Sequence, residues 1–524
     1  MIALLVIGCA TTGPHALTCP THGGAPWTQV VSPHFVLSTD QDQAQARRTV
    51  EALEQMFDAI GAVGLSSTDT PKGQINVVHF SDRADYDQFG PLQSLAYFQW
   101  NGRHDRERLP VAVVQGDLVK RTREIITHEL THAFVRYHFP QAPSWLNEGL
   151  AEYLSTLQLD QGLAVLGRQP SGASFWRGGW KNTHDPTGNS VLIPMSRAPT
   201  TAQLLQMPAA DFYAGRLFEP TTAAGQEAGR KQVANYAGAW TLVHLLISHP
   251  TYREPFNEFL QAMRTNQNAR QAWAVTVGKI APAQLEADYQ AALAPREIQV
   301  WRTAYTPAAP PAMTTRPLSD GEVHLLWAGL RTWRDPADRA LVVADLREAA
   351  EDATVAPALA TLKAELAYAT NNGALATRLL HDAAAAFPAD PRVLNAYGWQ
   401  LLLDGATAKA PRPKNDPLLL RVAARLRPLA RTAAELDLLA HVRRAAGDGD
   451  GALADEARAF AADPGCFQCL AVAAATFADK GNFSSAVAVA EKGLSILPEG
   501  MSLPALNAEL AGYQRKLAAS GGAP

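Results

Sequence analysis

The chain has 524 residues, more than one hydrophobic core usually supports, so we expect at least two domains. Apolar residues make up 47% of the sequence and charged residues 18%, a balance typical of a folded globular protein and not of a disordered chain. The formal net charge is -4 and the sequence has no long basic block, which argues against nucleic acid as the partner.

The sequence opens with a short apolar run that ends at Cys9, MIALLVIGC. This run is too short to cross a bilayer, which needs about 20 residues, but it matches the core of a secretory signal. Its last four residues resemble a bacterial lipobox, which implies that Cys9 carries lipid. Ala10 favours the outer membrane, whereas the absence of Lys or Arg before Arg47 leaves a cytoplasmic N-terminus as the alternative. We expect residues 1–26 to be a signal and tether that anchor an exported lipoprotein on the periplasmic side of the cell envelope.

Residues 27–302 begin with strand patterns and continue with helical ones. Residues 27–39 alternate as a strand does, and residues 41–62 then form an amphipathic helical pattern. Two short apolar runs, residues 75–80 and 111–114, predict further strands with a short helix between them. The helical pattern dominates the remainder. This order predicts an α+β domain with a small mixed sheet.

Residues 123–155 read REIITHELTHAFVRYHFPQAPSWLNEGLAEYLS and contain two histidines four residues apart. Side chains at this spacing share one face of a helix, so His128 and His132 can bind one ion. Glu129 then lies beside the ion and can polarise a water without being a ligand. Hydrolytic zinc needs three protein ligands and an open position, so the third ligand must come from elsewhere. The alternative is an ordinary pair of charged helices.

Residues 144–155 predict a second helix that can supply the third ligand. Its leucines form an apolar stripe at positions 146, 150 and 154, and Gly149 allows a neighbouring helix to approach closely. The helix carries Glu148 and Glu152, which follow His132 by 16 and 20 residues.

The segments THELTHAFV and PSWLNEGLAEYLS together resemble the gluzincin metallopeptidases, and in particular the bacterial peptidase MA-like domains. The resemblance implies a zincin-like catalytic domain that binds one Zn²⁺ per chain. The metal ligands it implies are His128, His132 and Glu148. It also implies Glu129 as the general base and Glu152 as a hydrogen-bond partner of a ligating imidazole. Because 20 residues is near the thermolysin-like spacing, Glu152 as the ligand is the alternative.

Tyr236 lies in the segment NYAGAWTLVHLL. It resembles the tyrosine that precedes a late helix in peptidase MA-like domains, which implies a catalytic role in stabilising the oxyanion. The alternative is a tyrosine that only packs.

Residues 303–319 contain four prolines and little charge, a composition typical of a stiff linker. Residues 320–524 are rich in alanine, and both Gly447 to Gly481 and Pro464 to Pro498 span 34 residues. This period resembles the tetratricopeptide repeat (TPR), which implies a helical repeat domain with a surface for a protein partner. An unrelated helical bundle is the alternative.

Cys466 and Cys469 form a C-x-x-C motif without two further zinc ligands nearby in the sequence. We expect a local disulfide, which suits an oxidising compartment.

Together these patterns predict an exported, lipid-anchored zinc metallopeptidase that hydrolyses a peptide or protein substrate. The alternative is a cell-envelope scaffold lipoprotein whose repeats bind a partner and whose zinc domain is structural or weakly active.

Overall fold

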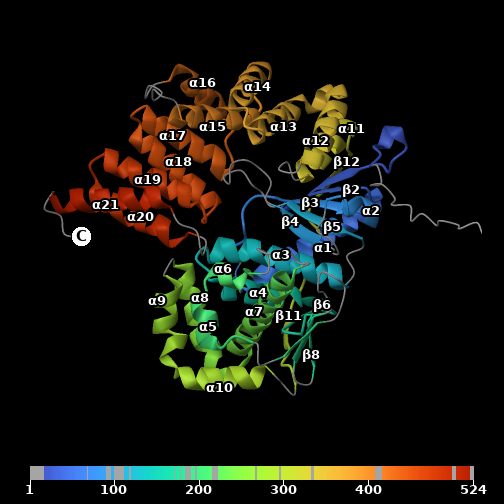
Figure 1. Ribbon diagram of the computed structural model, residues 1–524, viewed down its shortest axis with the longest axis vertical. Helices are drawn as coiled ribbons and strands as arrows, with labels where there is room; N and C mark the ends of the chain where they lie inside the picture. The colour runs from blue at the N-terminus through green and yellow to red at the C-terminus, as the bar shows by residue number, and fades with distance from the viewer. Residues whose placement is uncertain are drawn as a thin grey trace, which may run out of the picture.

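The computed structural model shows a sheet-containing unit joined to an arc of helix pairs (Figure 1). Cys9 and the rest of residues 1–16 lie outside the described residues. The structure describes residues 17–65, 67, 69–89, 96–99, 111–116, 120–170, 173–176, 179–182, 191–194, 198–214, 222–265, 268–293, 297–331, 336–407, 416–497 and 503–519.

The main sheet has six strands in the order β12-β1-β2-β3-β5-β4. The β2–β3 and β3–β5 pairs are parallel and the other pairs are antiparallel, so the sheet is mixed as predicted. In chain order its strands are β1 (Thr28–Val31), β2 (Phe35–Thr39), β3 (Ile75–Phe80), β4 (Ala96–Gln99), β5 (Val111–Gln115) and β12 (Thr314–Pro317).

The prediction of one strand over residues 27–39 was wrong, because β1 and β2 form a hairpin. Pro33 has no backbone N–H to donate, and the chain turns there. The Ser32 hydroxyl caps the turn by donating to the Phe35 carbonyl oxygen at 3.3 Å. The sequence reading also missed β4.

Helices cover both faces of this sheet. On one face, Ile75 and Val77 of β3 contribute to the core shared with α1 and α3. On the other face, Val78 and Phe80 of the same strand pack with aromatic side chains that include Trp327 of α11. The helices of this unit are α1 (Gln43–Ala59), α2 (Arg83–Tyr86), α3 (Lys120–His138), α4 (Ser144–Ser155), α5 (Thr201–Gln206), α6 (Ala209–Phe212), α7 (Ala223–Ser248), α8 (Pro250–Arg264), α9 (Ala269–Val275) and α10 (Pro282–Ala292).

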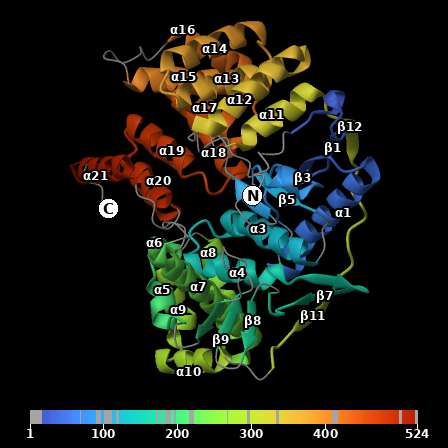
Figure 2. The same ribbon diagram turned by 45° about the vertical axis from the view of Figure 1, so that its right-hand side comes forward.

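In the part of the first unit that the structure describes, there are also two three-stranded sheets. One has the order β11-β7-β6, and Figure 2 shows β7 and β11 extending side by side away from α4. The strands are β6 (Gln158–Asp160), β7 (Leu163–Leu166) and β11 (Trp301–Ala304) in that sheet, and β8 (Ala173–Trp176), β9 (Gly179–Asn182) and β10 (Val191–Pro194) in the other.

Residues 303–319, predicted as a stiff linker, are part of the first unit. Strand β12 pairs with β1 along its whole length, and the Leu318 N–H donates to the Trp27 carbonyl oxygen at 2.9 Å. Proline is compatible with a strand at the edge of a sheet, which is where β12 lies. Residues 17–26, predicted as part of a tether, also join this unit, since Cys19 is buried beside Trp27.

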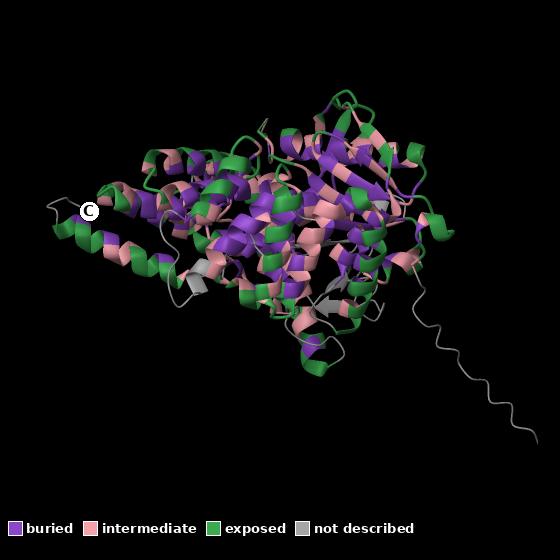
Figure 3. Ribbon diagram, turned by 90° about the horizontal axis from the view of Figure 1, so that it is seen from above, coloured by how far each residue is buried: buried purple, intermediate pink, exposed green. Residues whose placement is uncertain are grey.

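The second unit is an array of helix pairs with TPR-like spacing. Helices α17 and α19 begin 34 residues apart, at Ala433 and Phe467, and α18 and α20 are also offset by 34 residues. The helices of the array carry buried residues, which form apolar clusters between them, together with exposed residues (Figure 3). The helices are α11 (Asp320–Leu330), α12 (Pro336–Glu348), α13 (Ala356–Ala369), α14 (Gly373–Ala386), α15 (Pro391–Thr407), α16 (Pro417–Leu426), α17 (Ala433–Ala445), α18 (Gly449–Ala462), α19 (Phe467–Asp479), α20 (Phe483–Ser495) and α21 (Pro504–Ala519). Among the described residues, no helix combines the length and hydropathy needed to span a membrane.

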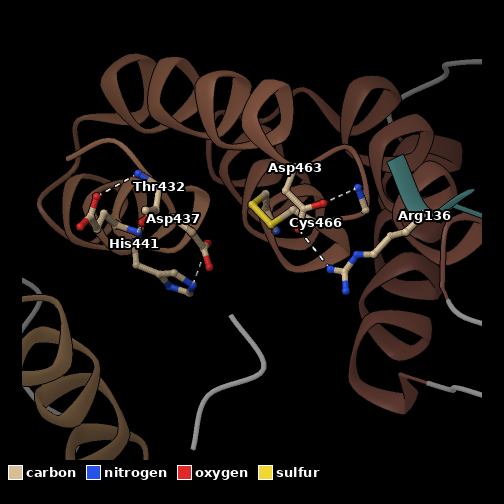
Figure 4. Close-up of a disulfide and its surroundings, with 9 residues drawn as sticks. Arg136, Thr432, Asp437, His441, Asp463 and Cys466 are labelled. Carbon is tan, nitrogen blue, oxygen red and sulfur yellow. Dashed lines mark hydrogen bonds and ion pairs between the residues drawn. A yellow bond between two sulfur atoms is a disulfide. The ribbon is translucent and has the colours of Figure 1, made fainter. Parts of the chain in front are cut away.

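The far end of the array returns to α3. Arg136 of α3 forms an ion pair with Asp463 at 3.2 Å, and Gln141 lies 3.5 Å from the Ser495 hydroxyl. Beside Asp463, Cys466 and Cys469 form a disulfide at the start of α19, as the sequence predicts (Figure 4).

Candidate metal centre

Helix α3 holds the two histidines of the HExxH motif on the side away from the sheet. Ile126, Leu130 and Phe134 are buried in the core and fix this orientation. His128 and His132, one turn apart, are partly buried, and their Nε2 atoms lie 3.2 Å from each other. Glu129 is also partly buried and adjoins His128.

Helix α4 brings Glu148 to the two imidazoles. Its Oε2 atom lies 3.3 Å from His128 Nε2 and 3.6 Å from His132 Nε2. The ligand atoms of these three residues all lie within 4.8 Å of one another. Glu148 is only 2% exposed, yet no residue that the structure describes donates a hydrogen bond of good geometry to Oε2. Two imidazole nitrogens and one carboxylate oxygen form a ligand set that suits zinc, so these residues fit the predicted metal.

Gly149 allows α4 to approach α7 closely, as predicted. A Cβ atom at this position would lie 2.7 Å from the Ala239 carbonyl oxygen and 2.6 Å from a methyl group of Val243. The close approach buries the helix that carries Glu148.

Charges in this site favour an ionised carboxylate and a bound cation or proton. Burial works against ionisation of Glu148, but His132, His128 and the Tyr213 hydroxyl outweigh it and lower the pKa of Glu148 to about 2. Burial also disfavours a proton on His128, but Glu148, Glu152 and Glu129 raise its pKa to about 9.

The outer nitrogens of the two imidazoles face different partners. Asn147 Oδ1 lies 3.0 Å from His132 Nδ1, within hydrogen-bond distance. Glu152 Oε1 lies 3.7 Å from His128 Nδ1, on the far side of the ring from Glu148. Burial, opposed by His128, raises the pKa of Glu152, and Glu148 adds to the rise. The structure therefore places Glu148 with the Nε2 atoms and Glu152 behind one imidazole.

Tyr236 does not lie at the start of a helix, and a second tyrosine, Tyr213, contacts the site. Tyr236 is in the middle of α7, which begins at Ala223 because the Thr222 side chain caps it, and its ring packs against Phe212 and Tyr213. The Tyr213 hydroxyl donates a hydrogen bond to Glu148 Oε1 at 2.8 Å. Sequence reasoning missed this contact, as well as that of Asn147.

A second group of potential ligands lies in the repeats, where Asp437, Glu456 and Cys469 are close together. Cys469 is joined to Cys466 in the disulfide and therefore offers no thiolate to a metal.

The chain matches no protein-family model and no curated protein. Among solved structures, it is similar to two structures of MamA, one of them a mutant, at 15% identity and a TM-score of 0.25, over 34% of this chain and 95% or 94% of theirs. It is also similar to the TPR domain of P58(IPK) at 12% identity and a TM-score of 0.20, over 57% of this chain and 84% of that one. Scores of this size assign neither fold nor function, so the TPR-like description rests on the helix pairs themselves.

Proposed function

We propose that this chain is a zinc-dependent peptide hydrolase whose repeat array binds a substrate or partner protein. The observation that carries the proposal is the buried Glu148 Oε2 atom, which lies 3.3 Å from His128 Nε2 and 3.6 Å from His132 Nε2, so that three potential ligand atoms converge on one point. An anion so deeply buried is costly unless a positive charge compensates it, and either a proton on His128 or a metal ion between the three residues supplies that charge.

In this proposal His128, His132 and Glu148 hold the metal. Zinc, when bound, supplies a Lewis acid that polarises the substrate carbonyl and promotes attack by water. The Glu129 carboxylate takes a proton from the attacking water and returns it to the leaving amine. Asn147 holds the His132 ring, and Glu152 lies behind the His128 ring. Tyr236, predicted as a catalytic residue, has its ring against Tyr213, which contacts Glu148.

As part of the same proposal, the protein is an exported lipoprotein of the bacterial cell envelope, anchored through Cys9. The disulfide between Cys466 and Cys469 supports an oxidising compartment. Metabolic labelling with a fatty acid tests the anchor, since Cys9→Ser should abolish the label.

A scaffold function is the second candidate, and the extent of the repeat array favours it. The array runs from α11 to α21, and such arrays present extended surfaces to partner proteins without chemistry of their own. In a scaffold, the metal centre is structural.

The Glu129→Gln variant separates the two functions, because Glu129 is the residue of the motif that the metal does not need. We expect it to retain one zinc ion per chain, measured by elemental analysis, and to lose peptide hydrolysis by about 10² to 10⁴-fold. Glu258→Gln on α8, an exposed glutamate outside the site, is the control and should keep full activity.

In cells, an enzyme lacking Glu129 should fail to complement a deletion of its gene. Full complementation by the zinc-loaded Glu129→Gln protein would instead favour the scaffold.

A further inference from the structure

The two carboxylate oxygens of Glu148 have different surroundings. Oε2 faces the imidazoles, whereas Oε1 accepts a hydrogen bond from the Tyr213 hydroxyl at 2.8 Å. Because Glu148 is 2% exposed, water cannot readily replace this donor. The hydrogen bond therefore fixes which oxygen is turned toward the histidines.

Tyr213 itself is held by the turn that follows α6. The side chain of Asn235, which is 2% exposed, donates from Nδ2 to the carbonyl oxygens of Asp211 at 3.3 Å and Phe212 at 3.1 Å. Phe212 is fully buried, and its ring packs 5.1 Å from that of Tyr213. The backbone just before Tyr213 is thus clamped to α7.

The Tyr213 hydroxyl also interacts with Asn147, the residue that lies within hydrogen-bond distance of His132. The Asn147 side chain interacts with the Tyr213 hydroxyl and lies 3.0 Å from His132 Nδ1. Tyr213 therefore contacts Glu148 directly and His132 through Asn147, although it lies 65 residues after Glu148 in the sequence.

We infer that Tyr213 is a positioning residue of the proposed metal centre, which holds Glu148 so that the carboxylate offers a single oxygen, Oε2, to the metal. This inference rests on the proposed function. A carboxylate free to rotate can bind through both oxygens and occupy the position that hydrolytic zinc must keep open. Tyr213 prevents that by engaging Oε1.

The test compares Tyr213→Phe with Tyr252→Phe in the full chain. Tyr252 is a matched control because its hydroxyl donates to a carboxylate, Asp288, at 2.5 Å outside the site. Zinc affinity is measured by competition with a chromophoric chelator, and the visible spectrum of the Co²⁺-substituted protein reports coordination number. We expect Tyr213→Phe to weaken zinc binding by about 10 to 100-fold and to reduce the Co²⁺ absorption, as higher coordination does. Tyr252→Phe should change neither.

A Tyr213→Phe protein with wild-type zinc affinity and an unchanged Co²⁺ spectrum would overturn the inference. Glu148→Gln distinguishes this failure from failure of the proposed function. If Glu148→Gln loses zinc while Tyr213→Phe binds it normally, the positioning role of Tyr213 is rejected and the proposed metal centre stands. If Glu148→Gln binds zinc as the wild type does, both the metal centre and the role of Tyr213 are rejected. If Tyr213→Phe does not fold, Asn235→Ala removes the clamp, leaves the phenol in place and is expected to give the same two changes.

Discussion

Glu148 and Glu152 are one helical turn apart, yet they lie on opposite sides of the His128 ring. Glu148 is near Nε2 and Glu152 is near Nδ1. We expect Glu148→Ala to abolish tight zinc binding because it removes one of the three proposed ligands. Glu152→Ala should weaken zinc affinity or activity by only about 10 to 100-fold, since a residue behind a ligand orients it without replacing it.

A zinc-competition titration of the two variants checks this order. If Glu152→Ala lost zinc more completely than Glu148→Ala, the third ligand would be Glu152, which follows His132 at the thermolysin-like spacing.

At the residue scale, the sequence could predict only what local spacing encodes. His128 and His132 share a face because they are one helical turn apart, and the structure places them so. Glu148 was inferred from its motif context. Tyr213 could not be found, because its contact with Glu148 depends on the path of the chain between α4 and α6. Asn147 immediately precedes Glu148 in the segment PSWLNEGLAEYLS, so its position in the sequence could have predicted that it lies near the site.

At the scale of elements, the close approach of α4 and α7 makes Gly149 sensitive to substitution. We expect Gly149→Ala to destabilise the protein by about 1 to 3 kcal/mol, because its Cβ would overlap the Ala239 carbonyl oxygen and Val243. Urea denaturation measures the change in the free energy of unfolding.

Gly229→Ala in α7 is the matched control, since no atom of the described residues lies within 4 Å of a Cβ there. It should be neutral or stabilising by up to about 1 kcal/mol, as alanine favours helix. Equal effects of the two substitutions would show that helix packing does not depend on Gly149.

The helical elements were easier to predict than the strands. The 34-residue period is a local feature of the chain and could be read from repeated Gly and Pro positions. In contrast, β12 forms because β1 lies beside it in space, nearly 300 residues earlier in the chain, and the proline-rich composition of residues 303–319 gives no sign of that pairing.

At the scale of the whole molecule, the first helix of the array is part of the first unit's core. Val323, Trp327 and Leu330 of α11 pack with Trp27 and Phe80 of the sheet unit. A chain that ends at residue 319 should therefore unfold at a lower urea concentration than one that ends at residue 369, after α13. Each large side chain uncovered costs about 1.5 to 3 kcal/mol.

Circular dichroism of the two truncated proteins gives their unfolding midpoints. If the two proteins unfolded at the same urea concentration, α11 would add nothing to the stability of the sheet unit. The domain boundary at residues 303–319 that composition predicts would then also mark where the stable unit ends.

In the described part of the chain, the repeat array contacts the first unit at its first helix, α11, and again at α3, and these contacts differ in kind. At α11 the support is apolar and buried, so salt affects it little. At the other end, the Arg136–Asp463 ion pair is solvent-exposed, and such pairs contribute only about 0 to 1 kcal/mol and weaken as ionic strength rises. On heating or under force, the contact of α18–α20 with α3 should therefore break first, while the contact of α11 with the sheet unit persists. The contact between the α18–α20 region and α3, the helix that carries the HExxH motif, is therefore the one expected to open first.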